Sequence, residues 1–157
     1  MTIFLPDKLF IGNLVFMLMQ KEKSCGIILF RKHGSDVKYL LLHYLAGHWD
    51  FSKGHVEENE TEQETALREL KEETGIADAG IFPGFRHEVS YYFKQHSQTI
   101  FKEVVYFLAE TNAKEVAISD EHIGYGWLSY ENAMKKMTFR NSKDMLEKAH
   151  EFLQKNN

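Results

Sequence analysis

Glutamates at helical spacing are the first chemical feature of this sequence. Glu69, Glu72 and Glu73 follow one another at intervals that a helix turns onto one surface. Like charges at that spacing repel one another unless a cation compensates them. Magnesium takes oxygen ligands and is usually held by one or two carboxylates together with substrate phosphates. The spacing therefore indicates a site for a hard divalent cation and for phosphate chemistry.

Basic residues compensate only part of this charge. Arg68 lies four residues from both Glu64 and Glu72, but Glu69 and Glu73 have no basic partner within the helix. An acidic helix face is more often simply solvated. Here, however, the segment from Glu57 to Glu73 contains eight acids and two bases, a net charge of −6, whereas the whole chain carries −4. This concentration of charge favours a functional site.

The carboxylates need a helix, and the sequence contains signals for both of its ends. Thr61 and Glu64 have the spacing of a capping box, and Gly75 is a left-handed stop. We therefore expect a helix from about Glu62 to Thr74. Its inner apolar stripe is short and consists of Ala66, Leu67 and Leu70.

The segment 54–76 resembles the Nudix box, which reads Gly, five residues, Glu, seven residues, Arg-Glu-apolar-x-Glu-Glu-x-Gly-apolar. Every position is met, by Gly54, Glu60, Arg68, Glu69, Leu70, Glu72, Glu73, Gly75 and Ile76. A match of this length in a strand-loop-helix context is very specific. The resemblance implies an α+β fold, an α/β/α sandwich around a mixed β-sheet, and hydrolysis of a nucleoside diphosphate linked to another group.

Segments outside the box resemble one group within this family, the asymmetric diadenosine tetraphosphate hydrolases. These segments are residues 48–57, 87–92, 104–109, 119–122 and 127–128. They extend the resemblance from about Ser24 to the C-terminus. Ser52 and Glu58-Asn59 depart from the proline and Pro-Gly that are usual in this group, and both changes affect the stiffness of the loop before the helix.

The resemblance also implies a metal site and a reaction. Glu69 and Glu73 would be the principal metal ligands, with Glu72 assisting, and Glu121 would offer a further carboxylate to the metal or to the attacking water. Magnesium is the expected cofactor, with manganese as a substitute. A metal-activated water would attack one phosphorus in line, and diadenosine tetraphosphate would give ATP and AMP. Glu72, Glu73 and Glu121 are therefore also catalytic candidates.

Other residues of the loop and helix are expected to assist. Lys53 and His55 are catalytic candidates that would steady charge developing on the phosphates, although a lone Lys or His in a loop is more often solvated. Glu60 and Arg68 would form an ion pair that ties the loop to the helix. The residues expected to support the structure are Glu60, Arg68, Gly54 and Gly75.

Base recognition is expected from aromatic surfaces, since stacking on a π-face is worth about 1–3 kcal/mol and tolerates different bases. By family position, Tyr92 and Phe139 would sandwich one adenine, and Lys102 would also bind the substrate. Aromatic residues make up 13% of the chain, and most of them must belong to the core.

The rest of the chain predicts a sheet with two further helices. Apolar, β-rich runs predict two hairpins and one short strand, at residues 24–30 with 37–44, 86–93 with 99–108 around a loop at 94–97, and 125–128. A short helix is expected at 129–136. Apolar residues from Met145 to Leu153 recur with a helical period behind an Asn141-Ser142 cap.

Composition limits the class of protein. With 157 residues, 43% of them hydrophobic, and no linker or repeat, we expect one domain over residues 1–157, with 1–18 as an N-terminal extension. The apolar run from Leu9 to Met19 is shorter than the ~20 residues that span a bilayer. We expect an extra strand there, or a start site at Met17 or Met19. The single cysteine, Cys25, excludes an intrachain disulfide and favours the cytoplasm.

Several functions stay open. A pI near 6.1 gives no basic footprint of a nucleic-acid binder, so the expected partner is a small dinucleoside polyphosphate or nucleotide, with no membrane, and the chain as a monomer or dimer. The alternatives are removal of pyrophosphate from RNA 5′ ends, hydrolysis of modified nucleoside triphosphates, and nucleotide sensing without turnover. A weak RNA track would comprise Lys94, His96, Lys102, Lys135, Lys136 and Arg140. The intact box carboxylates count against a sensor.

Overall fold

A seven-stranded mixed sheet forms the centre of the computed structural model, which describes Gly12 and residues 14–16 and 19–156. Its order is β3-β2-β1-β6-β5, with β4 paired to β1 and β7 to β2. β1 and β6 are parallel, and the other pairs are antiparallel. The strands are β1 Gln20–His33, β2 Asp36–Tyr44, β3 Trp49–Asp50, β4 Ser52–His55, β5 Gly80–Gln95, β6 Gln98–Glu110 and β7 His122–Leu128.

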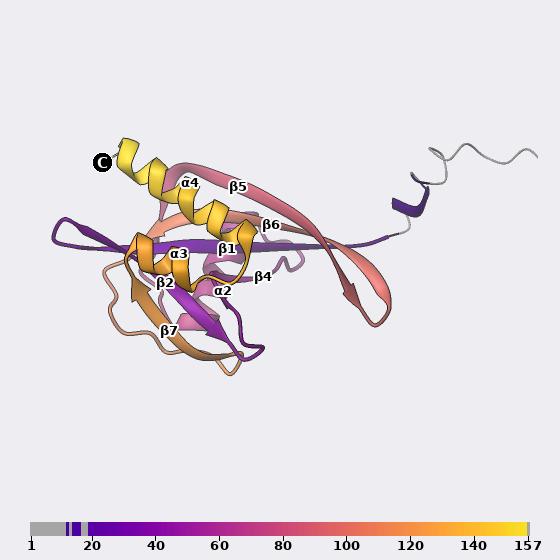
Figure 1. Cartoon of the computed structure of the whole chain (residues 1–157), viewed down its shortest axis with the longest axis horizontal. Coiled ribbons are helices and arrows are strands. Elements are labelled where there is room, and N and C mark those ends of the chain that lie inside the picture. Colours follow the sequence, from indigo (N-terminus) through magenta and orange to yellow (C-terminus); the bar gives the residue numbers. More distant parts are fainter. Residues whose placement is uncertain (1–11, 13, 17–18, 157) are drawn as a thin grey trace, which may run out of the picture.

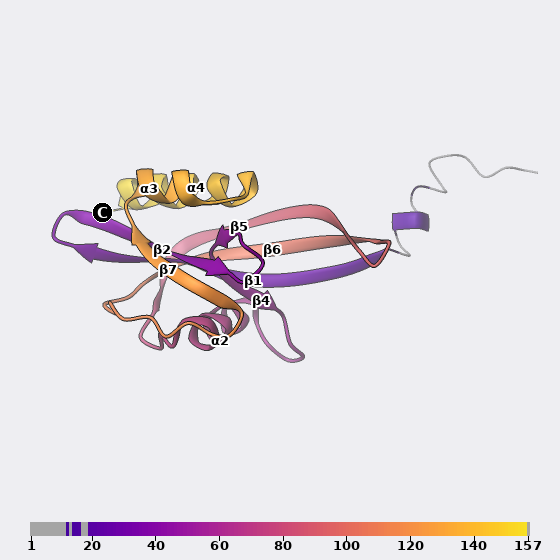
Figure 2. The same ribbon diagram turned by 60° about the horizontal axis from the view of Figure 1, so that its bottom comes forward.

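Helices cover both faces of this sheet. α3 (Tyr130–Lys136) and α4 (Arg140–Asn156) lie over the face that points toward the viewer in Figure 1. α2 (Glu62–Thr74) lies on the opposite face, and Figure 2 shows the sheet between the two helical layers. The expected α/β/α sandwich around a mixed sheet is confirmed. Within the described residues, no helix is long and apolar enough to cross a membrane.

Each face of the sheet has its own hydrophobic core. Successive side chains of a strand point to opposite faces, so Ile28 and Phe30 of β1 pack under α4, whereas Ile27 and Leu29 pack under α2. Cys25 lies on the α2 side and is buried. Because the middle of β1 is covered on both faces, residues 25–30 form a continuous apolar run without alternation.

Helix α2 begins and ends at the predicted residues, Glu62 and Thr74. Thr61 and Glu64 form the capping box, in which each side chain accepts a hydrogen bond from the other residue's backbone N–H. Gly75 has φ 73°, and its N–H donates to Lys71 O at 2.8 Å. Local signals therefore predicted this helix correctly.

Most strands are longer than predicted because their ends are polar. β1 begins at Gln20, and β5 runs from Gly80 to Gln95. The β5–β6 hairpin closes with a two-residue turn, in which His96 and Ser97 have φ 47° and 67°. Positive φ at both central residues suits the right-handed twist of the hairpin strands. The expected loop at 94–97 is thus shorter, and the hairpin extends beyond the body of the sheet (Figure 1).

Three further predictions need correction. Residues 52–55, expected in a loop, form strand β4 beside β1. Asn141 and Ser142 do not cap α4 but lie in its first turn, because Lys143 N already donates to Phe139 O at 3.1 Å. The described residues 14–16 are helical and not an extra strand. Residues 1–11, 13, 17 and 18, which include most of the expected extension, lie outside the described part of the chain.

Candidate functional site

The carboxylates of α2 lie against strand β4. The Glu69 carboxylate rests on Gly54, where an added Cβ would come within 2.0 Å of Glu69 Cδ. Gly54 pairs with Cys25 of β1, so the sheet fixes the height of this contact. Any side chain at this position would displace the carboxylate, which explains the need for glycine there.

Arg68 connects the loop to the helix. It donates through Nε and Nη2 to both oxygens of Glu60, so the expected ion pair is present. Its Nη2 also donates to His55 O at 3.0 Å, and its Nη1 donates to Glu69 Oε1 at 2.8 Å. Hydrogen bonds from Arg68 lower the pKa of the Glu60 carboxyl to about 2. The loop is therefore tied to the carboxylate surface by one guanidinium group.

Two details of the expected charge balance are wrong. Glu69 does have a basic partner in the helix, because the Arg68 fork reaches its immediate neighbour. Glu72 accepts from Arg68 Nη1 at 3.2 Å as expected, and its side chain remains exposed. Glu64, the other residue expected beside Arg68, turns back to Thr61 N instead. The capping interaction therefore replaces an ion pair that spacing alone allowed.

Glu73 is the buried member of the cluster, with 3% of its surface exposed. Its Oε2 has no hydrogen-bond partner and lies 3.5 Å from His122 Nε2. Burial, together with the charges of Glu69 and Glu121, raises the pKa of Glu73 to about 8, and the charge of Lys53 opposes this shift. A buried carboxylate oxygen without a donor is suited to a cation.

Glu121 reaches this cluster through the loop between β6 and β7, which runs beside the C-terminal end of α2. Ala117 N donates to Thr74 O at 2.9 Å, and Ser119 N donates to Glu73 O at 3.2 Å. These bonds hold the loop along the C-terminal turn of the helix. The Glu121 side chain is exposed, and its charge raises the pKa of both Glu69 and Glu73. The structure therefore brings Glu121 near the box although 48 positions separate it from Glu73 in the chain.

The donor set fits a magnesium ion that keeps part of its water shell. Among the described residues, no three His, Cys, Asp or Glu side chains converge into a complete metal site. Glu69 provides a carboxylate at the Gly54 contact, and Glu73 provides a second carboxylate with an unpartnered buried oxygen. Magnesium is usually held by one or two carboxylates plus water and substrate phosphates. Glu69 and Glu73 would hold it here.

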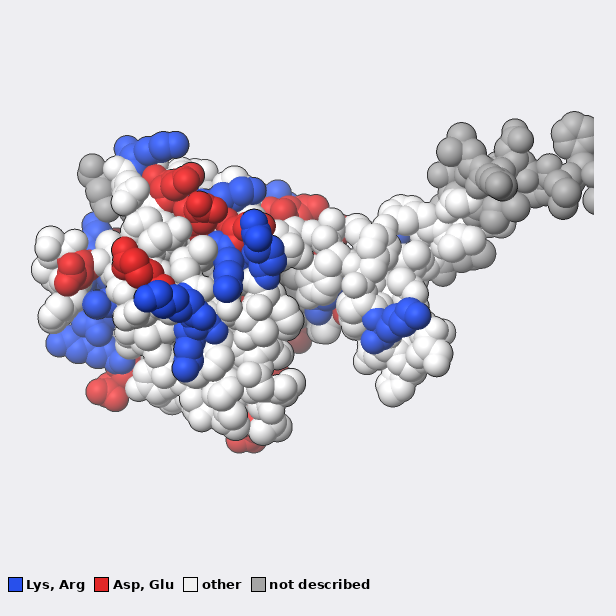
Figure 3. Space-filling view, in the orientation of Figure 1, with Lys and Arg blue, Asp and Glu red and all other residues white. Residues whose placement is uncertain are grey.

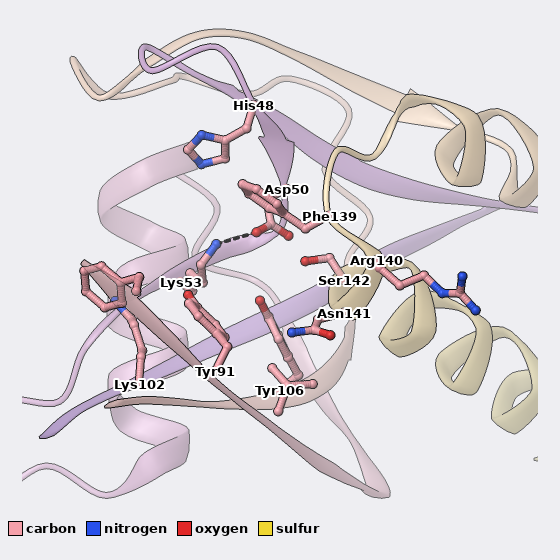
Figure 4. Close-up of a pocket in the computed structure, with 12 residues that line it drawn as sticks. His48, Asp50, Lys53, Tyr91, Lys102, Tyr106, Phe139, Arg140, Asn141 and Ser142 are labelled. Atoms are coloured by element: carbon pink, nitrogen blue, oxygen red, sulfur yellow. Dashed lines mark hydrogen bonds and ion pairs between the residues drawn. The ribbon is translucent and has the colours of Figure 1, made fainter. Parts of the chain in front are cut away.

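A cavity of about 570 Å³ opens on the other side of β4, beneath the start of α4 (Figure 4). Aromatic and basic side chains dominate its wall. The lining residues are His48, Asp50, Lys53, Val89, Tyr91, Phe93, Lys102, Tyr106, Phe139, Arg140, Asn141 and Ser142. Apolar clefts with a few convergent polar groups are the usual form of small-molecule sites, and the cations here suit an anionic ligand.

Hydrogen bonds between distant segments position Phe139 in this wall. Trp49 N donates to Thr138 Oγ1 at 2.9 Å, and Thr138 N donates to Trp49 O at 3.2 Å. These bonds join β3 to the segment that precedes α4. The His48 ring stacks on Tyr44 with centroids 4.4 Å apart and lies 5.2 Å from the Phe139 ring. A row of rings therefore borders one side of the cavity.

The expected adenine sandwich is only half assembled. Phe139 and Lys102 line the cavity, but Tyr92 does not. Tyr92 is 57% exposed and packs on Phe101 at 5.2 Å on the other side of the β5–β6 hairpin. Tyr91 takes its place, because successive residues of a strand face opposite sides. Of the expected pair, the structure therefore places only Phe139 in this cavity, together with Tyr91.

His55 does not line the cavity. Its Nε2 lies 3.1 Å from Glu22 Oε2, and its side chain is 63% exposed. Glu22 in turn is 3.5 Å from Lys102 Nζ. The structure therefore brings Lys53, but not His55, to the junction of the cavity and the carboxylates.

Comparison with known proteins decides the family. The model of the NUDIX domain matches residues 15–149. The chain belongs to the Nudix family. It is 40% identical over 143 residues to the bis(5′-nucleosyl)-tetraphosphatase (asymmetrical) of Mus musculus, covering 83% of this chain and 95% of the mouse protein. A protein of the same name from Caenorhabditis elegans is 33% identical over 135 residues, covering 83% of this chain and 96% of its own.

A solved structure shares the architecture of this Nudix chain. The C. elegans Ap4A hydrolase in a binary complex superposes with a TM-score of 0.75 and 30% identity, over 85% of this chain and 98% of that one. Because the family model and these relatives cover most of the chain, the chain is a Nudix hydrolase.

Several residues that line the cavity were not among those predicted from the sequence. Tyr91 could have been found, since the half-buried residues of β5 alternate as His87, Val89, Tyr91 and Phe93. Asp50 and His48 carried no spacing signal. They enter the site because β3 pairs with β2 and because the segment before α4 bonds to Trp49.

Proposed function

We propose that this Nudix hydrolase is an asymmetric bis(5′-nucleosyl)-tetraphosphatase that hydrolyses diadenosine tetraphosphate to ATP and AMP. Relatives of that name are similar over most of their length. The observation that carries the proposal is the position of Lys53, which lines the aromatic cavity and whose charge also acts on Glu73. A base held in the cavity would place its phosphate chain across this lysine and onto the carboxylates.

The cavity residues would orient the nucleotide. Tyr91 and Phe139 would stack on one adenine, and stacking tolerates either orientation of the base. Lys102, which is largely shielded from solvent, would bind the first phosphates. Burial lowers the pKa of Lys102, while the nearby Glu22 carboxylate opposes this shift. Fixed cations that need no reorganisation stabilise phosphate charge as it develops.

The carboxylate face would supply the reaction centre. Magnesium, or manganese in its place, would lower the pKa of a bound water and neutralise phosphate charge. Glu69 and Glu73 would hold the ion, and Glu72 and Glu121 would lie close enough to assist. Glu121 would accept a proton from the attacking water at the open side of the cluster, because its side chain is exposed there. Cys25 is a buried free thiol, and on that ground we propose the reducing cytoplasm as its compartment.

The RNA 5′-pyrophosphohydrolase reading has less support from the charge distribution. Lys and Arg are interspersed with Asp and Glu over the α3–α4 face in Figure 3. Lys102 and Arg140 line the cavity, whereas Lys94 and His96 lie at the β5–β6 turn and Lys135 lies on α3. Phosphate-tracking proteins need a continuous basic surface, and these residues are dispersed among several elements.

Product analysis tests the proposal. The purified protein is incubated with magnesium and, separately, with diadenosine tetraphosphate, 5′-triphosphorylated RNA and a modified nucleoside triphosphate. ATP plus AMP from the first, at the highest kcat/KM, is the expected result. Pyrophosphate from RNA with the dinucleotide intact would replace the proposal by the RNA activity, and two ADP molecules would contradict the asymmetric cut. Hydrolysis in ¹⁸O-water then shows whether ATP or AMP receives the water oxygen.

A further inference from the structure

An ion pair between a buried carboxylate and a partly buried lysine lies in the wall of the cavity. Asp50 is 2% exposed, and Lys53 Nζ donates to its Oδ2 at 2.6 Å, as the dashed line in Figure 4 marks. Its other oxygen, Oδ1, accepts from Phe51 N at 2.9 Å. The carboxylate is thus oriented by the backbone of its own strand region. Taking two charges out of water is costly, so this pair is not needed merely to complete a core.

The charge of Lys53 affects ionisable groups on both sides of it. On the cavity side, burial lowers the pKa of His48, and the charge of Lys53 lowers it further. On the other side, the charge of Lys53 opposes the rise in the pKa of Glu73 that burial causes. Its Nζ also lies 5.1 Å from the centre of the Tyr44 ring. The ammonium group therefore lies at the border between the aromatic cavity and the carboxylate cluster.

Asp50 is the only acidic residue among those that line the cavity, within the described part of the chain. No second carboxylate of the cavity wall therefore repels Asp50. The wall contains three cationic residues, Lys53, Lys102 and Arg140, and Lys53 is the one that pairs with Asp50. Without Asp50, the nearest attraction for the flexible Lys53 side chain would be the carboxylates on the Glu73 side. An ammonium on a four-carbon stem reorients readily when its partners change.

We propose that Asp50 is a positioning residue, which holds the Lys53 ammonium at the cavity border so that a substrate phosphate meets a fixed cation there. Asp50 acts through Lys53 and does not contact the reacting atoms. The inference rests on the proposed dinucleotide hydrolysis, because it assigns Lys53 to the phosphate chain. It goes beyond the box, since Asp50 precedes the box and belongs to no part of its pattern.

The test is a double-mutant cycle on turnover of diadenosine tetraphosphate with magnesium. Asp50→Asn keeps the size of the side chain and removes its charge. We expect kcat to fall about 10- to 100-fold, as for a misplaced catalytic group, while KM changes less than about threefold because the stacking surfaces remain. Lys53→Ala should lose as much or more, and the double variant should be no slower than Lys53→Ala alone, because coupled residues are not additive.

Two further variants separate positioning from a general loss of structure. Asp50→Glu keeps the charge and should recover part of the lost kcat. Asp78→Asn is the matched control, since Asp78 also accepts hydrogen bonds, from Thr111 Oγ1 and Asn112 N, but does not line the cavity. Its kcat should equal that of the unaltered enzyme. Thermal melting of each variant shows how much stability it has lost.

Any one of three outcomes would contradict the proposal. Asp50→Asn could retain kcat within twofold, the Asp50→Asn and Lys53→Ala losses could multiply in the double variant, or Asp50→Glu could be as slow as Asp50→Asn although its melting temperature is normal. The unaltered enzyme in the same assay reports on the proposed function separately. If it hydrolyses the dinucleotide while the cycle is additive, only the role of Asp50 fails. If it does not, the proposed function fails first and this inference with it.

Discussion

The two faces of the central sheet are built in contrasting ways. On the α2 face, the acidic groups come almost entirely from residues 60–73, and one arginine holds three of their carboxylates. On the α4 face, the cavity collects side chains from β3, β4, β5, β6 and the start of α4. The first face is acidic and the second is aromatic and basic. The proposed metal site thus comes from one short segment of the sequence, whereas the cavity is assembled from segments that lie far apart in the chain.

The sharpest way to separate the two faces is Glu73→Gln. Removal of this buried charge should lower kcat on diadenosine tetraphosphate about 10³-fold, because a preorganised electrostatic group is lost at the reaction centre. AMP binding measured by calorimetry without magnesium should stay within about twofold, since AMP would occupy the cavity face. Glu72→Gln is the control, and its exposed side chain predicts a smaller loss. A Glu73→Gln protein with unchanged turnover would remove the metal assignment.

A methyl group on Gly54 tests whether the acidic face depends on its contact with β4. The added Cβ would lie 2.0 Å from Glu69 Cδ, so the carboxylate must move. We expect kcat for Gly54→Ala to fall about 100-fold, the cost of about 1 Å of misplacement. Gly80→Ala meets no atom within 4 Å and serves as the control. Equal kcat values for the two variants would show that Glu69 tolerates displacement.

A pair of adjacent tyrosines tests the cavity face. Tyr91→Ala should raise KM about tenfold, which corresponds to the loss of one stacking surface, and should leave kcat nearly unchanged. Tyr92→Ala should leave both values unchanged, because Tyr92 lies on the opposite side of β5. Steady-state kinetics on diadenosine tetraphosphate distinguishes them. The reverse pattern would restore the family-based assignment of Tyr92 and contradict the register of the strand.

The smallest effect is expected where α2 is attached to the sheet by charge. Arg86 donates to both oxygens of Glu62, and Lys23 donates to one of them. These bonds lower the pKa of Glu62 from 4.5 to about 2. A depressed carboxyl pKa stabilises the folded state above pH 4.5, and this stability is lost as the pH falls toward 2.

Urea unfolding between pH 7 and pH 2 measures this contribution. Glu62→Gln should be slightly less stable at pH 7, and its free energy of unfolding should fall less steeply below pH 4.5 than that of the unaltered chain. Partial exposure keeps the difference small. Glu58→Gln, an exposed loop position, is the control. Parallel pH profiles for the unaltered chain and Glu62→Gln would mean that the bridge contributes nothing to folding.

Predictions from the sequence succeeded where the signal was local. The bounds of α2 followed from Thr61, Glu64 and Gly75, whose hydrogen bonds span four residues or fewer. The ion pair of Glu60 with Arg68 joins residues eight positions apart and was also expected. Strand ends were less accurate, because polar residues such as those of β5 continue a ladder through backbone bonds that leave no hydrophobic pattern. Family position pointed to Phe139, which lines the cavity, and to Tyr92, which lies on the opposite side of β5.

The sequence alone determined that Glu69, Glu72 and Glu73, the residues of the proposed metal site, share one surface of a helix, because the helical period places them there whatever surrounds them. Only the tertiary structure decided what that surface faces. The β1–β4 pairing sets Gly54 beneath Glu69, the alternation of β5 turns Tyr91 and not Tyr92 inward, and the contact of β3 with Thr138 brings His48 and Asp50 into one wall with Phe139. Contacts between residues tens of positions apart depend on strand order and register, and no short stretch of sequence specifies either of them.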